Sequence, residues 1–170
     1  PAMSFITSQY SGETIQIPLL HNTVSQVPLA FMRAASTGRN FGIPIEFVSY
    51  NNETNWTFEN AVGLCLVHGI LPRPNDIGKP LEHIAGVWRI LDGFPIETME
   101  WQPYWSQQEI SCNNAAFKLS VYSSFALKLL IIASFQEEEA SALLLLNDYY
   151  DVVDCNNSSV VFSTVDRFPV

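Results

Sequence analysis

The chain of 170 residues has few basic side chains: 8 Lys and Arg stand against 17 Asp and Glu, so the formal net charge is −9. With so little positive charge there is no basic patch to attract phosphate groups, and we expect neither nucleic acid nor a membrane as partner. Neutral or cationic ligands suit this charge better. Hydrophobic residues nevertheless make up 48% of the chain, which is enough for a folded core.

Cysteines are also scarce. Cys65, Cys112 and Cys155 lie far apart without CxxC spacing, which argues against a zinc site, and their odd number argues against a complete disulfide framework. The chain has no HExxH sequence, no G-x-S-x-G sequence and no glycine-rich phosphate loop. We therefore predict no metal ion and no cofactor, and a serine hydrolase is disfavoured.

Long apolar runs are missing as well. The longest, residues 64–71 and 125–133, are much shorter than the roughly 20 residues of a membrane-spanning helix. No signal peptide is visible, and the chain begins with Pro1, so we expect a trimmed N-terminus or a piece of a longer protein. Asn-x-Ser/Thr sequences favour a secreted, extracellular location; they begin at Asn52, Asn55, Asn156 and Asn157.

The first part of the chain alternates strand and helix patterns. The β-rich segment Thr14–Leu20 ends at a polar cluster, and Val24–Ala35 follows with helical spacing of its apolar residues. A second strand, Ile43–Val48, runs into the polar, aromatic loop Ser49–Trp56. Strand, helix and strand in this order are typical of a parallel sheet, and loops after such strands often carry binding sites.

Two helices are predicted next, and then the pattern changes. Thr57 is a suitable N-cap for a helix over Phe58–His68, and a second helix is predicted over Pro80–Leu91. From residue 96 on, short strands follow one another at the spacing of about 8–12 residues that is typical of β-sandwiches. These strands are predicted over 98–105, 116–122, 126–135, 141–147, 149–153 and 159–164, with an acidic hairpin tip at 136–139. We therefore predict two domains, residues 1–95 and residues 96–170.

This order resembles the C-terminal portion of a glycoside-hydrolase-like protein, in which a (β/α)8 barrel is followed by a β-sandwich. The residues that carry the resemblance are Val67–Pro74, Val87–Phe94, Trp101–Trp105, and the strand pair Phe117–Tyr122 and Leu127–Ala133. The resemblance implies an α/β fold followed by an all-β fold: the last strand–helix units of a (β/α)8-type barrel and a small C-terminal antiparallel β-sandwich. Another chain or a removed part of the same protein would then supply the missing strands, because open sheet edges do not stay exposed.

The resemblance also implies hydrolysis or binding of glycosides, with carbohydrate as ligand. Glycosidases use two carboxylates about 5–9.5 Å apart. Glu46 lies inside an apolar strand, where burial would raise its pKa as a general acid requires, and Glu53 in the following loop is the second candidate. In the alternative interpretation, Glu46 pairs with Arg33 or Arg39 or faces solvent, and Glu53 is only solvated.

Sugar-binding residues are predicted at the ends of the same two strands. These residues are His21, Asn22, Tyr50, Asn51, Asn52 and Trp56. Amide and imidazole groups would hold hydroxyls, and the aromatic rings would stack on a sugar. The alternative is an Asx-type turn at His21 and Asn22 and a loop packed by its own aromatic residues. We expect His68 and His83 to be structural.

A second function remains open from the sequence alone. The chain could be a non-catalytic secreted binding or structural module of α+β type, whose acidic surface provides solubility. A third interpretation is a small α/β domain of secretin or receptor type, because residues 16–46 also fit one strand–helix–strand unit. We expect Trp101 and Trp105, which share one face of a strand, to lie between the α/β part and the β part.

Overall fold

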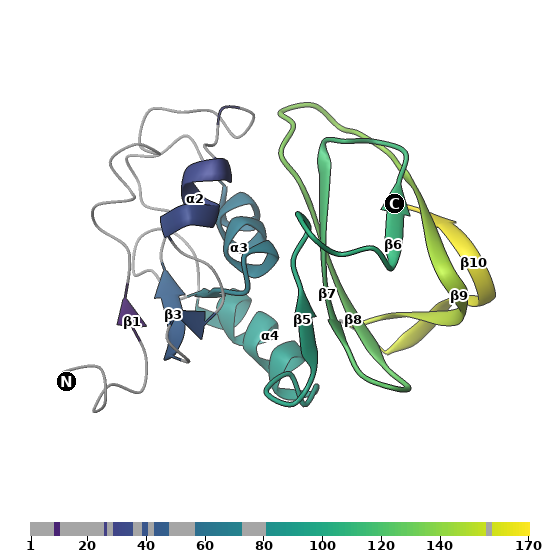
Figure 1. The fold of residues 1–170 in the computed structure, drawn as a ribbon, viewed down its shortest axis with the longest axis horizontal. Coiled ribbons are helices and arrows are strands. Elements are labelled where there is room, and N and C mark those ends of the chain that lie inside the picture. The colour runs from purple at the N-terminus through teal and green to yellow at the C-terminus, as the bar shows by residue number, and fades with distance from the viewer. Residues whose placement is uncertain are drawn as a thin grey trace.

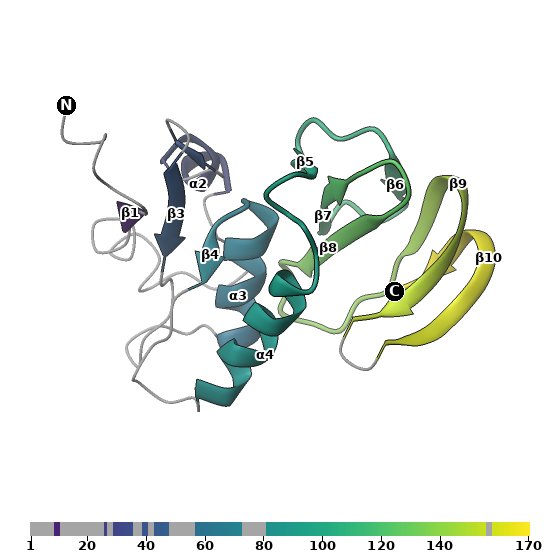
Figure 2. The ribbon, with the colours of Figure 1, turned by 90° about the horizontal axis from the view of Figure 1, so that it is seen from below.

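The computed structural model describes residues 9–10, 26, 29–35, 39–40, 43–47, 57–72, 81–155 and 158–170. These residues form four successive layers, which run from left to right in Figure 1: a small mixed sheet, a helix layer, a middle sheet and an outer sheet. The view from below in Figure 2 keeps this order, with the N-terminal elements at one end and the C-terminal hairpin at the other. Within the described part of the chain, no helix is long and apolar enough to cross a membrane.

The small sheet is built on β3 (Ile43–Phe47). β1 (Gln9–Tyr10) and β4 (Leu71–Pro72) pair with β3 in parallel, whereas β2 (Arg39–Asn40) pairs with it in antiparallel orientation. Three of its four strands are only two residues long.

Helix α3 (Phe58–Val67) lies at the centre of the molecule, and its sequence fixes both ends. At its start the backbone N–H of Asn60 donates to Thr57 Oγ1 and that of Thr57 donates to Asn60 Oδ1, both at 3.2 Å, so the predicted N-cap is confirmed. At its end Gly69 has φ 69°, and the Ile70 N–H reaches back to the Cys65 carbonyl at 3.0 Å. This Schellman turn uses the conformational freedom of glycine to stop the helix after one buried face is complete.

Two further helices, α2 (Leu29–Ala35) and α4 (Leu81–Asp92), complete the helix layer. Met32 of α2 and Leu91 of α4 are buried in the same apolar cluster as Leu64 of α3. The indole N–H of Trp88 donates to the Pro72 carbonyl at 3.0 Å, which ties α4 to β4.

The middle sheet has the strand order β5 (Glu100–Gln102), β7 (Phe117–Ser123), β8 (Lys128–Ser134), all antiparallel. Leu129, Ile131 and Ala133 of β8 pack on the helices, while Leu130 and Ile132 face the outer sheet. Both faces of β8 are thus covered, which explains why its sequence is apolar almost throughout. The approach to α3 is close: a Cβ placed on Gly63 would lie 3.2 Å from that of Ala133.

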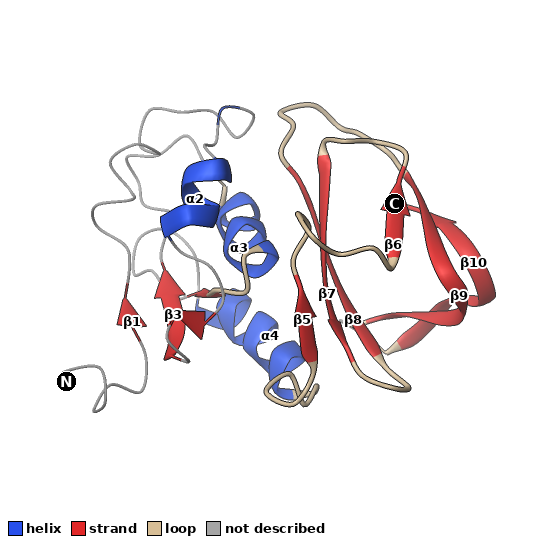
Figure 3. Ribbon diagram, viewed as in Figure 1, coloured by secondary structure: helices blue, strands red, loops and turns tan. Residues whose placement is uncertain are grey.

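The outer sheet has the order β10 (Ser159–Pro169), β9 (Leu143–Asp154), β6 (Ile110–Cys112), again antiparallel. Its inner face contributes Ile110, Leu144 and Phe168 to a second apolar cluster, together with Leu119 and Val121 of β7. Figure 3 shows β9 and β10 as a long hairpin at the edge of the molecule.

The predicted fold class, a barrel end followed by a sandwich, is wrong: the structure is a small, β-rich α+β domain. β3, α3 and β4 form one short parallel crossover, but β4 has two residues, β2 runs antiparallel, and α4 leads into antiparallel strands. In a barrel the helices form the outer ring, whereas here α3 lies between two sheets and packs on β8. The described residues form no barrel units, so the prediction that another chain supplies missing barrel strands loses the fold on which it rested and stays untested.

The predicted elements differ from the observed ones mainly after residue 96. The segments 141–147 and 149–153 form one strand, β9, and β6 was not predicted. The acidic segment 136–139 is exposed as expected, but it joins strands of different sheets and is not a hairpin tip. The division into domains at residue 95 stays a prediction; helices before it and β8 after it share one apolar cluster.

Candidate functional site

Most residues predicted to bind or cleave sugars lie outside the described part of the chain. This applies to His21, Asn22, Tyr50, Asn51, Asn52, Glu53 and Trp56. Glu46 lies in β3, where it pairs with Tyr10 of β1 and Leu71 of β4 along the backbone, and its side chain is outside the described residues. The catalytic and sugar-binding assignments therefore stay predictions, and a site has to be sought among the other residues.

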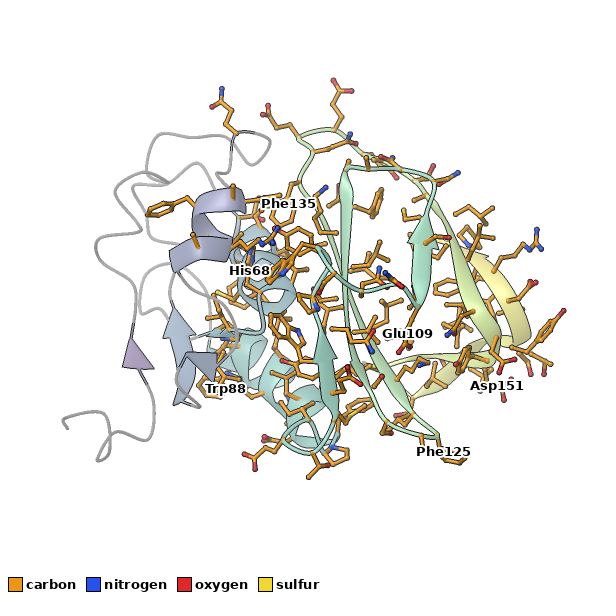
Figure 4. The ribbon with its side chains drawn as sticks, viewed as in Figure 1. His68, Trp88, Glu109, Phe125, Phe135 and Asp151 are labelled. Carbon is orange, nitrogen blue, oxygen red and sulfur yellow. The ribbon has the colours of Figure 1, made fainter. Side chains whose placement is uncertain are left out.

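The first candidate is a buried polar cluster around His68, which is labelled in Figure 4 between α3 and the middle sheet. His68 caps α3 and is fully buried; its Nδ1 lies 2.7 Å from the Leu64 carbonyl oxygen and must carry the proton. The other ring nitrogen, Nε2, is then free to accept from the Tyr104 hydroxyl at 3.4 Å. Burial lowers the pKa of His68, with backbone hydrogen bonds opposing the shift, so the ring stays neutral.

Ser120 completes this cluster without acting as a nucleophile. Its hydroxyl donates to the Val67 carbonyl at 2.7 Å and accepts from the Tyr104 N–H at 3.0 Å. A serine is activated when its proton points at a base, and here the proton points at a backbone carbonyl and not at His68. The cluster therefore joins α3 to the middle sheet, and the prediction that His68 is structural is confirmed.

Aromatic rings surround the same cluster. Trp105 lies 5.8 Å from the His68 ring and 5.7 Å from the Trp101 ring, and the Arg33 guanidinium lies 5.0 Å above Trp105. Burial raises the pKa of Tyr104, opposed by the charge of Arg33, so its hydroxyl stays a donor. The predicted position of Trp105 between the two parts of the chain is confirmed. The indole N–H of Trp101 is buried and has no hydrogen-bond partner among the described residues.

The second candidate is an ion pair at one end of the middle sheet. Glu109, which precedes β6, accepts from Lys128 of β8, from Gln102 of β5 at 3.0 Å and from Ser123 of β7 at 3.3 Å. Desolvation acts to raise the pKa of Glu109, but the hydrogen bond and charge of Lys128, with the bonds from Gln102 and Ser123, hold that pKa below its usual range. The Lys128 ammonium also lies 5.8 Å from the ring centroid of Tyr150 in the outer sheet.

This ion pair joins the segment before β6 to the three strands of the middle sheet. Its carboxylate is occupied by three donors from three strands, and no second carboxylate is among its described hydrogen-bonding partners, whereas glycosidases need two. No group of three or more potential metal ligands occurs among the described residues. The sequence analysis did not identify this pair. Lys128 is a charged residue at the start of an apolar strand, and the same kind of signal made Glu46 a candidate.

The third candidate is a set of exposed apolar residues on the β9–β10 hairpin, here called the outer face. Its members are Leu145, Tyr149 and Val153 of β9 and Val160 and Val161 of β10. Along β9 the residues Leu145, Tyr149 and Val153 are exposed, while the alternate residues Leu144, Leu146 and Val152 belong to the inner apolar cluster. Val160 of β10 lies opposite Val153. The exposed fractions are 39% for Leu145, 65% for Tyr149, 45% for Val153, 58% for Val160 and 52% for Val161. This is the largest gathering of exposed apolar side chains on one described element pair.

A fixed negative charge sits within the outer face. Asp151, labelled in Figure 4, lies between Tyr149 and Val153 on β9. Its Oδ1 accepts from the Ser163 hydroxyl and from the Thr164 N–H, both at 2.8 Å, and these bonds lower the pKa of Asp151. The outer face thus combines exposed apolar side chains with a carboxylate that stays ionised.

Comparison with known proteins adds no identification: no family model, no curated protein and no solved structure matches this chain.

Proposed function

We propose that this chain is a non-catalytic binding module of α+β type, and that the outer face of the β9–β10 hairpin is its binding surface. The observation that carries the proposal is the set of five exposed apolar side chains on one hairpin, because contiguous exposed apolar surface marks interaction sites more often than scattered residues do. Aromatic residues such as Tyr149 are typical anchors of protein interfaces.

The chemistry of the buried His68 cluster and of the partly buried Glu109–Lys128 pair supports a non-catalytic role. The ring nitrogens of His68 and the carboxylate of Glu109 are occupied by hydrogen bonds within the fold. Both groups join layers of the structure, and using either in catalysis would break those bonds. The glycoside-directed function stays a prediction, but it no longer has the barrel on which the resemblance depended.

Selection from a random peptide display library tests the proposal without assuming a ligand. Peptides that bind the immobilised chain are then titrated in solution against the wild type, the double variant Tyr149→Ser/Val160→Ser and the control Phe31→Ser. Phe31 is an exposed apolar residue on α2 in the helix layer, and the middle sheet lies between that layer and the β9–β10 hairpin. We expect the double variant to lose at least tenfold in affinity and the control to bind like the wild type.

Two results would contradict the proposal. Equal binding of the selected peptides to all three proteins would place the binding surface elsewhere. Retention of wild type and double variant alike on an array of glycans would favour the carbohydrate prediction in place of a protein-binding role.

A further inference from the structure

We propose that an extended, apolar segment of a partner protein binds along β8 and adds a fourth strand to the middle sheet. The binding site is the open edge of β8, that is, the side that faces away from β7 and has no strand partner among the described residues. This site is separate from the outer face and goes beyond the proposed function. Three observations carry the inference: the free backbone groups of this edge, its regular shape, and the apolar layers on both sides of it.

The hydrogen bonds at the two ends of the β7–β8 pair show which backbone groups are free. The Ser124 N–H donates to the Leu127 carbonyl at 2.9 Å, and the Phe135 N–H donates to the Ala116 carbonyl at 3.4 Å. Bonded and non-bonded pairs alternate along an antiparallel ladder, so the odd-numbered residues of β8 bond β7. The even-numbered residues direct their N–H and C=O groups to the open edge, and such a row is a template for a further strand. These residues are Lys128, Leu130, Ile132 and Ser134.

The open edge of β8 differs from the other edges of the two antiparallel sheets. β5 and β6 are each three residues long, and β10 has register shifts against β9, a φ of 51° at Thr164 and a proline at its last position. Short strands, bulges and proline protect an edge from further pairing. β8 is seven residues long, pairs with β7 without a register shift, and contains no proline and no acidic residue. Its charged residue, Lys128, stands at the first position and is paired with Glu109. Among the described edge strands of these sheets, β8 is therefore the best suited to accept another strand over its full length.

The side chains of β8 determine what kind of strand fits beside it. Leu129, Ile131 and Ala133 on one face are buried against the helices. Leu130 and Ile132 on the other face pack towards the outer sheet but stay only partly buried. Figure 2 shows β8 between these two layers. A strand added beside β8 would meet an apolar layer on each of its faces, so the partner segment is apolar at consecutive positions and not at alternate ones.

The charge of the chain argues against a second copy as the occupant. Each copy has a formal net charge of −9, and a net charge far from zero favours the monomer. An uncharged apolar segment of another protein brings no such repulsion.

Amide hydrogen exchange of the full chain, measured by NMR, tests the edge itself. In the free chain we expect the N–H groups of Leu130 and Ile132 to exchange about tenfold faster or more than those of Leu129 and Ile131, which bond β7. Slow exchange of Leu130 and Ile132 in the free chain would mean that another part of the chain already covers the edge, and this would overturn the proposal.

Binding is tested with a synthetic peptide of about seven valines, which favour strands, flanked by lysines for solubility. Two N-methylated forms carry the same number of methyl groups, on alternate valines in one and on consecutive valines in the other. Alternate methylation leaves one edge of the peptide free to pair, whereas consecutive methylation blocks both edges. By fluorescence anisotropy we expect the alternate form to bind like the parent and the consecutive form to lose about tenfold or more in affinity. The bound peptide should also slow the exchange of the Leu130 and Ile132 amides.

Variants of the chain place the peptide on the edge. Ile132→Pro removes an N–H that β7 does not use, so it should weaken binding of the alternate form about tenfold or more. Thermal unfolding checks that this variant folds, and Ser134→Pro, at the end of the strand, replaces it if it does not. Tyr149→Ser/Val160→Ser on the outer face is the control and should bind the peptide like the wild type.

The outcomes distinguish this inference from the proposed function. Equal affinity of the two methylated forms, or no binding of any form up to about 1 mM, would rule out strand addition. If Tyr149→Ser/Val160→Ser weakens binding and the proline variant does not, the peptide occupies the outer face, and the inference fails while the proposed function stands. If the proline variant alone loses the peptide, the inference holds whatever the outer face binds. If analytical ultracentrifugation shows a dimer that the proline variant abolishes, the occupant is a second copy and the inference is overturned.

Discussion

The middle sheet and the outer sheet are both three-stranded and antiparallel, yet they differ in how many faces are covered. Helices cover one face of the middle sheet and the outer sheet covers the other, so β8 reads Lys-Leu-Leu-Ile-Ile-Ala-Ser with hardly a polar residue. The outer sheet is covered on its inner face only, and polar residues are interspersed among the apolar ones along the second half of β9. The exposed leucine, tyrosine and valines of the hairpin are unusual, because a sheet with one face open to solvent favours polar residues on that face.

The sharpest test of this comparison replaces one leucine in each sheet. Leu129 of β8 is 3% exposed within the helix-facing cluster, so Leu129→Ala removes buried methyl groups and leaves a cavity. We expect a loss of about 2–5 kcal/mol in the free energy of unfolding. Leu145→Ala on the outer face should cost about 0.5 kcal/mol or less. Urea unfolding measures both, and similar losses would mean that the outer face is not open to solvent.

The next largest effect concerns the ion pair that joins the two sheets. Glu109→Gln leaves the partly buried ammonium of Lys128 without its charged partner, and we expect a loss of about 1–3 kcal/mol. Because the folded-state pKa of Glu109 lies below its ordinary 4.5, its contribution is present above that pH and disappears as the pH falls through the folded-state value.

Two controls sharpen this prediction. Glu138→Gln removes a carboxylate from an exposed loop and should leave stability nearly unchanged. Glu109→Gln/Lys128→Met removes both charges and should recover part of the loss. If Glu109→Gln is as harmless as Glu138→Gln, the pair does not hold the sheets together.

A smaller, pH-dependent effect is expected at the opposite face of the middle sheet. Burial holds the pKa of His68 below its ordinary 6.5. As the pH falls below 6.5, the unfolded chain therefore binds a proton at His68 more readily than the folded chain does. The contribution of His68 is therefore complete above pH 6.5 and declines as the pH falls below it, by up to about 1.4 kcal/mol per pH unit.

Urea unfolding at about pH 7.5 and 5.5 measures this slope. His68→Gln should lower stability at both values and remove part of the difference between them. All other titratable groups are the same in both proteins, so their contributions cancel in the comparison. An unchanged difference in the variant would show that His68 does not carry the pH dependence.

The sequence predicted single elements better than it predicted their arrangement. The helix start at Thr57 follows from local hydrogen bonds within four residues, and β3 and β8 follow from their apolar runs. Whether β3 belongs to a barrel depends on pairing between distant segments, such as β3 with β1. An apolar run fits a buried barrel strand and a strand in the middle of stacked layers equally well, and this ambiguity produced the wrong fold class.

The candidate surface was equally hard to read from the sequence. The sequence pattern predicts two strands separated at Asp148 within 141–153, and it does not distinguish Leu145, Tyr149 and Val153 from other strand residues. Only the register of β9 with β6 and β10 shows which face these side chains occupy. The polar loops at the ends of the predicted parallel strands lie outside the described residues, so the site residues assigned to them stay predictions.

The smallest expected effect tests the irregular edge of β10, which separates docking on the face from strand addition. Thr164 adopts φ 51°, where its branched side chain is strained and where its N–H donates to Asp151 at 2.8 Å. Thr164→Gly relieves the strain and keeps the N–H, so we expect a gain of about 0.5–1 kcal/mol in thermal and urea unfolding. Ser159→Gly, in the same strand without positive φ, should instead cost about 0.5–1 kcal/mol. If both variants lose stability alike, Thr164 does not form a bulge in solution, and β10 would offer a regular edge for pairing with another strand.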